Sequence, residues 1–96
     1  MEDVVYYNEL YDLYGELLTD KQRKYFEDYY FNNLSLQEIA ENNNVSRNAV
    51  HKSLKDIIDK LHYYEDKLKL YEKGKEINKL IENIDINIKN KIKELI

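Results

Sequence analysis

Residue types that commonly contact bases and phosphates follow one another closely between residues 46 and 55. Arginine pairs with guanine or phosphate, asparagine pairs with adenine, and lysine contacts phosphate oxygens. Arg47 and Asn48 are therefore candidates for base contacts, and Lys52 and Lys55 are candidates for phosphate contacts. The full set of candidate nucleic-acid-binding residues is Ser35, Gln37, Ser46, Arg47, Asn48, His51, Lys52 and Lys55.

A helix-turn-helix would present these side chains on one face, and the sequence meets the requirements of that motif. Ala40 is small enough to lie where two helices cross, and Asn44 tolerates the positive φ that the turn needs. Val45 is expected to fill the core at the turn, and Ser46 is expected to cap the second helix. The inward positions of that helix are predicted to be Ala49, Val50 and Leu54.

The periodicity of apolar residues predicts helices along the whole chain and no strand. Capping boxes at Thr19–Gln22 and Ser35–Glu38 mark two helix starts, and Gly74 is a candidate C-cap or hinge. The predicted helices cover residues 3–18, 20–31, 36–41, 47–73 and 75–96. The fold class that follows is all-α, a helix-turn-helix bundle with a long recognition helix and a C-terminal helical tail.

The length of 96 residues fits one domain, residues 1–96. Residues 20–55 are expected to form the helix-turn-helix core. Residues 56–96 are expected to form an extension of the long helix and a tail, with dimerisation as their role.

A heptad pattern of apolar residues follows the predicted long helix from Val50 to Tyr71. This seam could join two subunits, or it could be a groove that the first and last helices of the same chain fill. We expect a mixture of the two. The first half of the long helix packs in the chain's own core, and its second half contacts the tail or a partner subunit. A homodimer would read paired half-sites with its two recognition helices. The residues assigned to this seam are Leu61, Tyr64, Leu68 and Tyr71.

The net charge of −4 argues against a protein that coats nucleic acid without selectivity. The charge is uneven: residues 1–45 carry a net charge of −7, and residues 46–96 carry +3. Contacts to nucleic acid are therefore expected in the second half. The one basic cluster of the first half, a candidate for contact with a flanking phosphate, is Lys21, Arg23 and Lys24.

Several functional classes find no support in the composition. The chain has no cysteine, which excludes disulfides and thiolate metal sites and suits a reducing cytoplasm. The acidic start at residues 1–3 does not resemble a secretory signal, and no apolar run approaches the ~20 residues that span a bilayer. His51 and His62 lack a metal-binding spacing, and no catalytic constellation or phosphate-binding glycine loop is present. We expect no membrane insertion, no cofactor and no enzymatic activity.

Tyrosine is unusually frequent, with ten residues against two phenylalanines. Tyrosine rings can stack on unpaired bases, which would favour RNA. The stronger expectation is packing, because five of them fall on apolar helix stripes: Tyr6, Tyr7, Tyr14, Tyr29 and Tyr30.

Taken together, five segments of the sequence resemble the YlxM family, and the resemblance covers residues 6–82. The segments are Leu18–Tyr25, Tyr29–Tyr30, Leu36–Glu41, Val45–Val50 and Tyr64–Lys73. The helix-turn-helix alone would equally suggest region four of housekeeping sigma factors. The sequence departs from the family pattern at Asn48, where glutamine is common, and at His51. Both positions are on the predicted outward face, so no base preference can be transferred.

The resemblance implies a DNA-binding fold like sigma region four, with an added helical tail and often a dimeric state. It also implies a tie to the signal recognition particle pathway. Two functional hypotheses result, and a purely structural role is a third possibility. The first is a DNA-binding regulatory protein that acts through the helix-turn-helix. The second is an adaptor that binds protein or RNA components of the signal recognition particle, such as its GTPase, without binding DNA.

Overall fold

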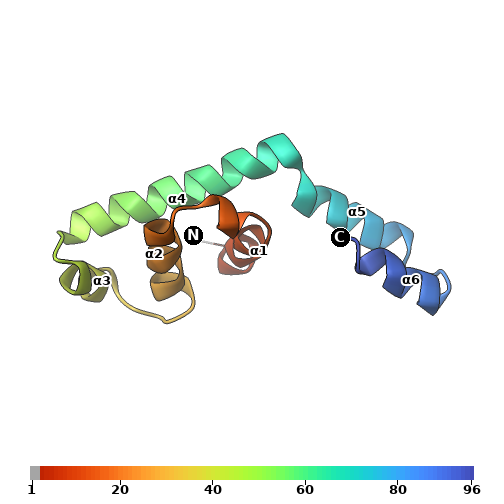
Figure 1. The fold of residues 1–96 in the computed structure, drawn as a ribbon, viewed down its shortest axis with the longest axis horizontal. Helices are drawn as coiled ribbons and strands as arrows, with labels where there is room; N and C mark the ends of the chain where they lie inside the picture. The colour runs from red at the N-terminus through yellow and green to blue at the C-terminus, as the bar shows by residue number, and fades with distance from the viewer. Residues whose placement is uncertain (1–2) are drawn as a thin grey trace.

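The computed structural model describes residues 3–96 and shows a long helix lying across three shorter ones, followed by a two-helix tail (Figure 1). No strand occurs in this range, which confirms the all-α helix-turn-helix bundle. Residues 1 and 2, part of the acidic N-terminus considered above, lie outside the described range. The elements are α1 (Val4–Tyr14), the 3-10 turn η1 (Gly15–Leu17), α2 (Asp20–Tyr30), α3 (Leu36–Asn43), α4 (Arg47–Leu68), α5 (Leu70–Leu80) and α6 (Ile86–Lys93).

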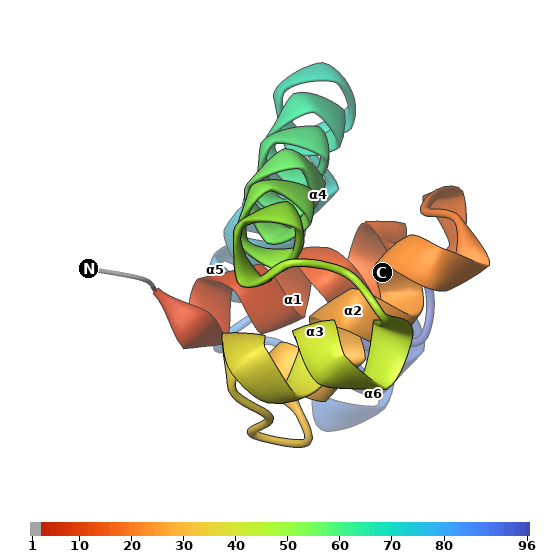
Figure 2. The same cartoon turned by 90° about the vertical axis from the view of Figure 1, so that its left-hand side faces the viewer.

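The core lies under one apolar stripe of α4. Viewed along α4, helices α1, α2 and α3 gather on the same side of it (Figure 2). The stripe repeats at three- and four-residue steps, which keeps its side chains on one face of the helix. Burying each such side chain stabilises the fold by about 1.5–3 kcal/mol. The stripe consists of Val50, Leu54, Ile57 and Leu61, and it packs with Leu10, Tyr14, Phe26, Ile39 and Ala40.

Local capping signals correctly mark where the short helices begin. The Thr19 hydroxyl accepts a hydrogen bond from the backbone N–H of Gln22 at 3.1 Å, and the Gln22 side chain accepts one from the N–H of Thr19 at 3.0 Å. Ser35 and Glu38 form the same reciprocal pair, with both distances 3.0 Å. Both predicted capping boxes are therefore confirmed, and they fix the first residues of α2 and α3.

The predicted helices of the C-terminal half are wrong in their boundaries. The long helix ends at Leu68 rather than at residue 73, because Lys69 has a positive φ of 59° that breaks the helix. Gly74 lies inside α5 and is neither a cap nor a hinge. The tail is not one helix over 75–96 either: α5 ends at Leu80, and Asp85 caps a separate α6.

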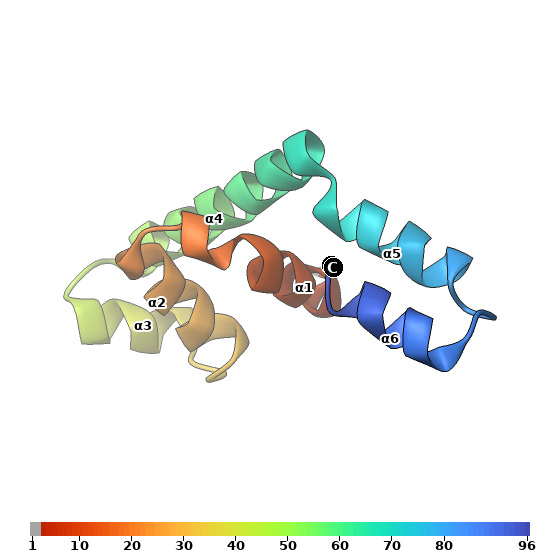
Figure 3. The same cartoon turned by 45° about the vertical axis from the view of Figure 1, so that its right-hand side comes forward.

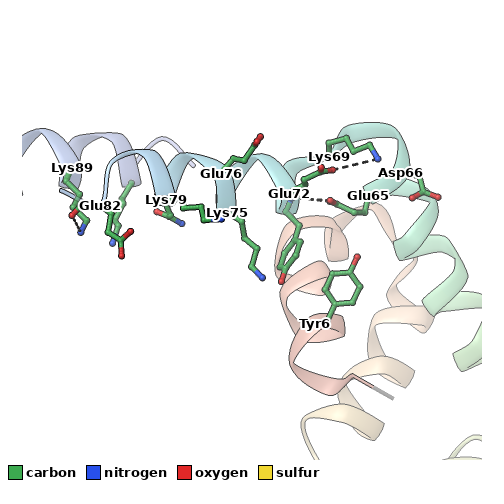
Figure 4. Close-up of a pocket in the computed structure, with 13 residues that line it drawn as sticks. Tyr6, Glu65, Asp66, Lys69, Glu72, Lys75, Glu76, Lys79, Glu82 and Lys89 are labelled. Atoms are coloured by element: carbon green, nitrogen blue, oxygen red, sulfur yellow. Dashed lines mark hydrogen bonds and ion pairs between the residues drawn. The ribbon is translucent and has the colours of Figure 1, made fainter. Parts of the chain in front are cut away.

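The break after α4 is held by a buried carboxylate, that of Glu65, which is only 7% exposed. It accepts hydrogen bonds from the Tyr14 hydroxyl at 2.6 Å and from the backbone N–H groups of Tyr71 at 3.0 Å and Glu72 at 3.2 Å. No side chain at the start of α5 caps that helix, so the Glu65 carboxylate accepts hydrogen bonds from its free backbone N–H groups (Figure 4). A negative charge at this place is favoured, because the N-terminal end of a helix carries a partial positive charge. We call this arrangement the Glu65 cap.

The Glu65 cap changes the acidity of both partners. Burial opposes the charged form of Glu65, but the hydrogen bonds from Tyr14 and from the start of α5 outweigh it and lower the pKa of this carboxyl. Burial, together with the hydrogen bond to Glu65, raises the pKa of Tyr14 to about 12. The carboxylate and the phenol therefore remain charged and neutral, respectively, at neutral pH.

The α5–α6 tail projects away from the core as a hairpin (Figure 3). Within the tail only Ile81, at the end of α5, is buried. The chain measures 53 × 26 × 25 Å with a radius of gyration of 16.5 Å, whereas a compact domain of this length would have roughly 12–13 Å. Of the seam residues, Leu61 is fully buried in the chain's own core, Tyr64 and Tyr71 pack partly against it, and Leu68 is 44% exposed.

We expect Glu65→Gln to lower the free energy of unfolding at pH 7 by on the order of 2 kcal/mol, because a neutral amide accepts these hydrogen bonds less strongly. Since the pKa of Glu65 is lower in the folded chain than its ordinary value of 4.5, the unfolded chain binds the proton more tightly. The stabilisation by the ionised Glu65 is therefore complete above pH 4.5. It is lost as the pH falls through the lower pKa that Glu65 has in the folded chain. Urea unfolding at pH 7 and in acid measures the difference between parent and variant.

The control for this prediction is Asp66→Asn, which removes one negative charge from an exposed neighbouring position. Its effect on unfolding should be small at both pH values. A Glu65→Gln difference that is equally large in acid and at pH 7 would contradict the role assigned to the carboxylate.

Asn44 supplies a second test, because its φ of 53° is in the left-handed region. Replacement by valine should lower the free energy of unfolding by about 1–2 kcal/mol, since a side chain branched at Cβ resists this backbone conformation. Replacement by glycine should be tolerated. Thermal unfolding of the two variants measures the difference, and equal melting temperatures would refute this account of the turn.

Candidate nucleic-acid interface

The corner between α3 and α4 forms as the sequence predicts at its two decisive positions. Ala40 is buried, and the backbone N–H of Val45 donates to the carbonyl of Ala40 at 3.0 Å. Asn44 ends α3 in the left-handed conformation, so the chain reverses within a few residues. The side chain of Asn43 donates to the carbonyl of Ile39 at 2.7 Å and so satisfies a backbone acceptor near the helix end.

Two positions of the predicted corner are wrong. Val45 does not fill the core, because its side chain is 37% exposed. Ala49 is exposed as well, although the pattern placed it inward. The physical reason is that the buried stripe of α4 begins only at Val50, so the positions before it are left to solvent.

The first turns of α4 present a row of exposed polar side chains that point away from the core. No acidic residue lies between Arg47 and Lys55, so this stretch carries three basic groups, and the nearest acids on α4 are Asp56 and Asp59, one turn beyond Lys52 and Lys55. Among the described residues, none of these side chains forms a hydrogen bond or ion pair within the chain. The exposed side chains, in agreement with their predicted direction, are Arg47, Asn48, His51, Lys52 and Lys55.

The two candidate serines are engaged as helix caps. The Ser35 hydroxyl oxygen accepts from the N–H of Glu38, and the Ser46 hydroxyl oxygen accepts from the N–H of Ala49, each at 3.0 Å. The Ser46 hydroxyl still has its own proton to donate and so remains able to bind a phosphate oxygen, whereas the Ser35 hydroxyl also bonds to the carboxyl of Glu38. Gln37 is exposed, and its amide donates to the carboxylate of Glu41 at 3.1 Å.

Acidic groups on α3 limit what that helix can contribute. The backbone and side chain of Ser35 hydrogen bond to Glu38 and lower the pKa of its carboxyl, which favours the charged form. Glu41 is the other acid of α3, and the helix has no basic residue. Attraction to phosphate therefore comes from α4, and α3 offers only its N-terminal hydroxyl and amide.

A cleft of about 450 Å³ lies between the start of α4 and the other helices. Arg47, His51 and Lys55 line it from α4, and Tyr29 and Tyr30 line it from the end of α2. The apolar pattern predicts both tyrosines in the core, against which they do pack partly, but it gives no sign that they also lie beside Arg47, His51 and Lys55. Both tyrosines are on the last turn of α2, where side chains often lie at the edge of the core. That position could have indicated that they are partly exposed.

The basic cluster at the start of α2 lies elsewhere. Arg23 pairs with Asp20, and the Lys21 ammonium group lies 5.7 Å from the centre of the Tyr25 ring. Lys60, well along α4, approaches Gln22 at 3.5 Å, so this end of α2 adjoins later turns of α4 rather than Arg47. A contact from the cluster to a flanking phosphate remains a prediction.

Two further properties bear on function. Among residues 3–96, no three His, Cys, Asp or Glu side chains are placed to hold a metal ion. His62 lies instead against the rings of Tyr6 and Tyr7, at 5.8 Å between centroids in each case. None of the described helices has the length and apolar character to cross a membrane.

Comparison with known proteins gives a consistent family. The whole chain, residues 1–96, matches the family model UPF0122, described as "Putative helix-turn-helix protein, YlxM / p13 like". The chain belongs to this YlxM/p13-like family. Its relatives include the UPF0122 protein of Caldanaerobacter subterraneus, 49% identical over 83 residues, which are 86% of this chain and 71% of the relative.

Other YlxM/p13-like relatives show similar identity. The protein of Fusobacterium nucleatum is 46% identical over 79 residues, which cover 82% of this chain and 77% of that protein. The protein of Malacoplasma penetrans is 53% identical over 77 residues, with 77% and 72% covered. The family description agrees with the α3–α4 corner, so the resemblance to the YlxM family is confirmed.

We expect the cap at Ser46 to control the order of the first turn of α4 in this YlxM/p13-like chain. Ser46→Ala should lower the free energy of unfolding by about 1 kcal/mol, because the N–H of Ala49 loses its partner. Ser46→Gly should cost only a few tenths of a kcal/mol, since glycine is tolerated at this position. Chemical unfolding compares the two, and an equal effect would show that the hydroxyl does not act as a cap.

Proposed function

We propose that this YlxM/p13-like chain is a cytoplasmic, non-enzymatic regulatory protein that binds duplex DNA with the first turns of α4. The observation that carries the proposal is the row of exposed side chains on a capped helix start with no acid among them. Such a helix end fits the major groove, where arginine and asparagine read base edges. In this arrangement Arg47 and Asn48 contact bases, and His51 lies on the same outward face.

Phosphate contacts hold the helix in place. Lys52 and Lys55 extend toward the backbone of the duplex, and Ser35, Gln37 and Ser46 donate to phosphates at the two helix starts. The cleft lined by Tyr29 and Tyr30 adjoins this surface, and Tyr29 offers its phenolic hydroxyl for the same purpose. Because few basic groups take part and the first half of the chain is acidic, binding should be moderate and sensitive to salt.

We further propose that the protein acts as a homodimer through residues 56–96, with the two α4 helices reading paired half-sites. The elongated shape and the exposed tail support this arrangement. We also propose a role in the signal recognition particle pathway, and the support for it is the resemblance to the YlxM family.

The second candidate function, an adaptor for protein or RNA components of the signal recognition particle, is favoured by one observation. From Val4 to Leu17 the chain carries the acidic residues Glu9, Asp12 and Glu16 and no base. An acidic surface repels phosphate and suits a basic protein surface instead. In that case the α3–α4 corner serves as a docking surface rather than as a reader of DNA.

The double variant Arg47→Ala, Lys52→Ala should weaken duplex binding by about tenfold or more, because it removes one base-reading side chain and one phosphate contact. Fluorescence anisotropy with duplex fragments from the neighbourhood of the protein's own gene measures the affinity. The slope of log affinity against log salt should also become shallower by about one to two units.

A matched control is the double variant Lys79→Ala, Lys91→Ala, which removes the same charge from exposed positions on the tail. Its affinity for duplex should stay close to that of the parent. Parent protein that shows no duplex binding at low salt, yet is captured together with particle protein or RNA from nuclease-treated and untreated lysate, would favour the adaptor instead.

A further inference from the structure

The cleft between the start of α4 and the end of α2 has the size and the lining of a small-molecule site. Its volume of about 450 Å³ lies in the range of roughly 300–1,000 Å³ that such sites occupy. One part of its lining is basic, and the other part is aromatic and aliphatic. The side chains that decide its chemistry are Arg47, His51 and Lys55 in the basic part and Tyr29, Leu54 and Ile58 in the apolar part.

The basic part is arranged for an anion. Arg47, His51 and Lys55 are four residues apart, so they lie along a single strip of α4, which we call the basic strip. None of them forms a hydrogen bond or an ion pair with the described residues. No described acidic side chain lines this cleft, whereas Glu9 and Asp12 line the groove between α1 and the tail. In a chain with a net charge of −4, a cleft whose charged lining is entirely basic favours a negative ligand.

The charges and donors of the basic strip match a phosphate monoester. Such a group carries a charge of about −1.5 to −2 at neutral pH and has three acceptor oxygens. The guanidinium of Arg47 can form paired hydrogen bonds with a phosphate, and the ammonium of Lys55 adds a second charge. The imidazole of His51, between them on the strip, has an N–H to donate. A carboxylate has one charge and two oxygens, so it would leave part of the strip without a partner.

The apolar part of the lining suits a planar ring. The Tyr29 ring packs edge-to-face on the Tyr30 ring, with 4.9 Å between the centroids and 86° between the planes, which holds its orientation. Leu54 and Ile58 extend the apolar lining from α4. Tyrosine rings are common platforms for nucleobases. A small molecule that joins a phosphate to a planar ring is a nucleoside monophosphate.

We propose that this cleft binds a free nucleoside monophosphate, with the phosphate on the basic strip and the base against Tyr29. The bound nucleotide also regulates the protein, and this second step rests on the proposed DNA-binding function. Arg47 and Lys55 belong both to the basic strip and to the row that meets duplex, and they cannot serve both ligands at once. Nucleotide and duplex therefore exclude each other, and each lowers the affinity for the other by the same factor.

Isothermal titration calorimetry with adenosine monophosphate (AMP) tests the site with no duplex present, since a purine offers the larger face for stacking. The dissociation constant should be roughly 10 µM to 1 mM, as expected for a ligand of this size in an open cleft. Adenosine and inorganic phosphate should each bind at least about tenfold more weakly, because each fills one part of the lining. A dissociation constant for AMP above about 10 mM, or one equal to that of inorganic phosphate, would overturn the proposal.

Three variants separate the cleft from the rest of the α4 surface. Lys55→Ala removes a charge from the basic strip and should weaken AMP binding about fivefold or more. Lys52→Ala removes the same charge from a neighbouring position that does not line the cleft, so it should weaken duplex binding but leave AMP binding within about twofold. Tyr29→Leu, verified as folded by circular dichroism, should weaken AMP binding about fivefold or more and leave binding of inorganic phosphate unchanged. Equal effects of Lys52→Ala and Lys55→Ala on AMP would contradict the assigned site.

Fluorescence anisotropy with labelled duplex, at constant ionic strength, tests the mutual exclusion. AMP at about ten times its dissociation constant should weaken duplex binding by the parent about tenfold, and by Lys55→Ala far less. Unchanged duplex affinity at saturating AMP would overturn the exclusion. The two ideas fail separately: AMP binding without duplex binding keeps the nucleotide site and removes the DNA-binding function. Duplex binding without AMP binding does the reverse.

Discussion

The whole arrangement depends on one constraint, the single apolar stripe along the first four turns of α4. Val50, Leu54, Ile57 and Leu61 must all be covered, and no one of the short helices is long enough to cover them alone. Helices α1, α2 and α3 therefore converge on one side of α4, and the opposite side is left to solvent (Figure 2). The exposure of Arg47 and Lys52 is a consequence of this burial, since a helix that buries one face must present the other.

The Glu65 cap links the second half of the molecule to this core. Its carboxylate joins three elements, because it is on α4 and accepts from Tyr14 of α1 and from the first turn of α5. A buried carboxylate is stable only when its hydrogen bonds are made, so the direction of α5 is coupled to the packing of α1 on α4. The start of the tail thereby gains a defined position relative to α1 and α4.

Sequence patterns predicted what local chemistry determines and missed what tertiary contacts determine. The caps at Thr19, Ser35 and Ser46 and the left-handed Asn44 were predictable, because each depends on residues within one turn. The break at Lys69 was not, because lysine carries no signal for a positive φ and the stabilising acceptor comes from another element. At the candidate interface the outward direction of the α4 side chains followed from helical spacing. The cleft lined by Tyr29 and Tyr30 did not, since it depends on how α2 packs beside α4.

The central claim is that the outward face of the first turns of α4 is the surface that meets duplex DNA. Titration of the isotope-labelled protein with a duplex that it binds, followed by NMR of the backbone amides, tests this most directly. The account predicts that the largest shifts occur from Ser46 to Lys55, with smaller ones from Ser35 to Gln37, and that the tail is unaffected. Shifts concentrated on α1 or on the tail, with the start of α4 unchanged, would contradict it.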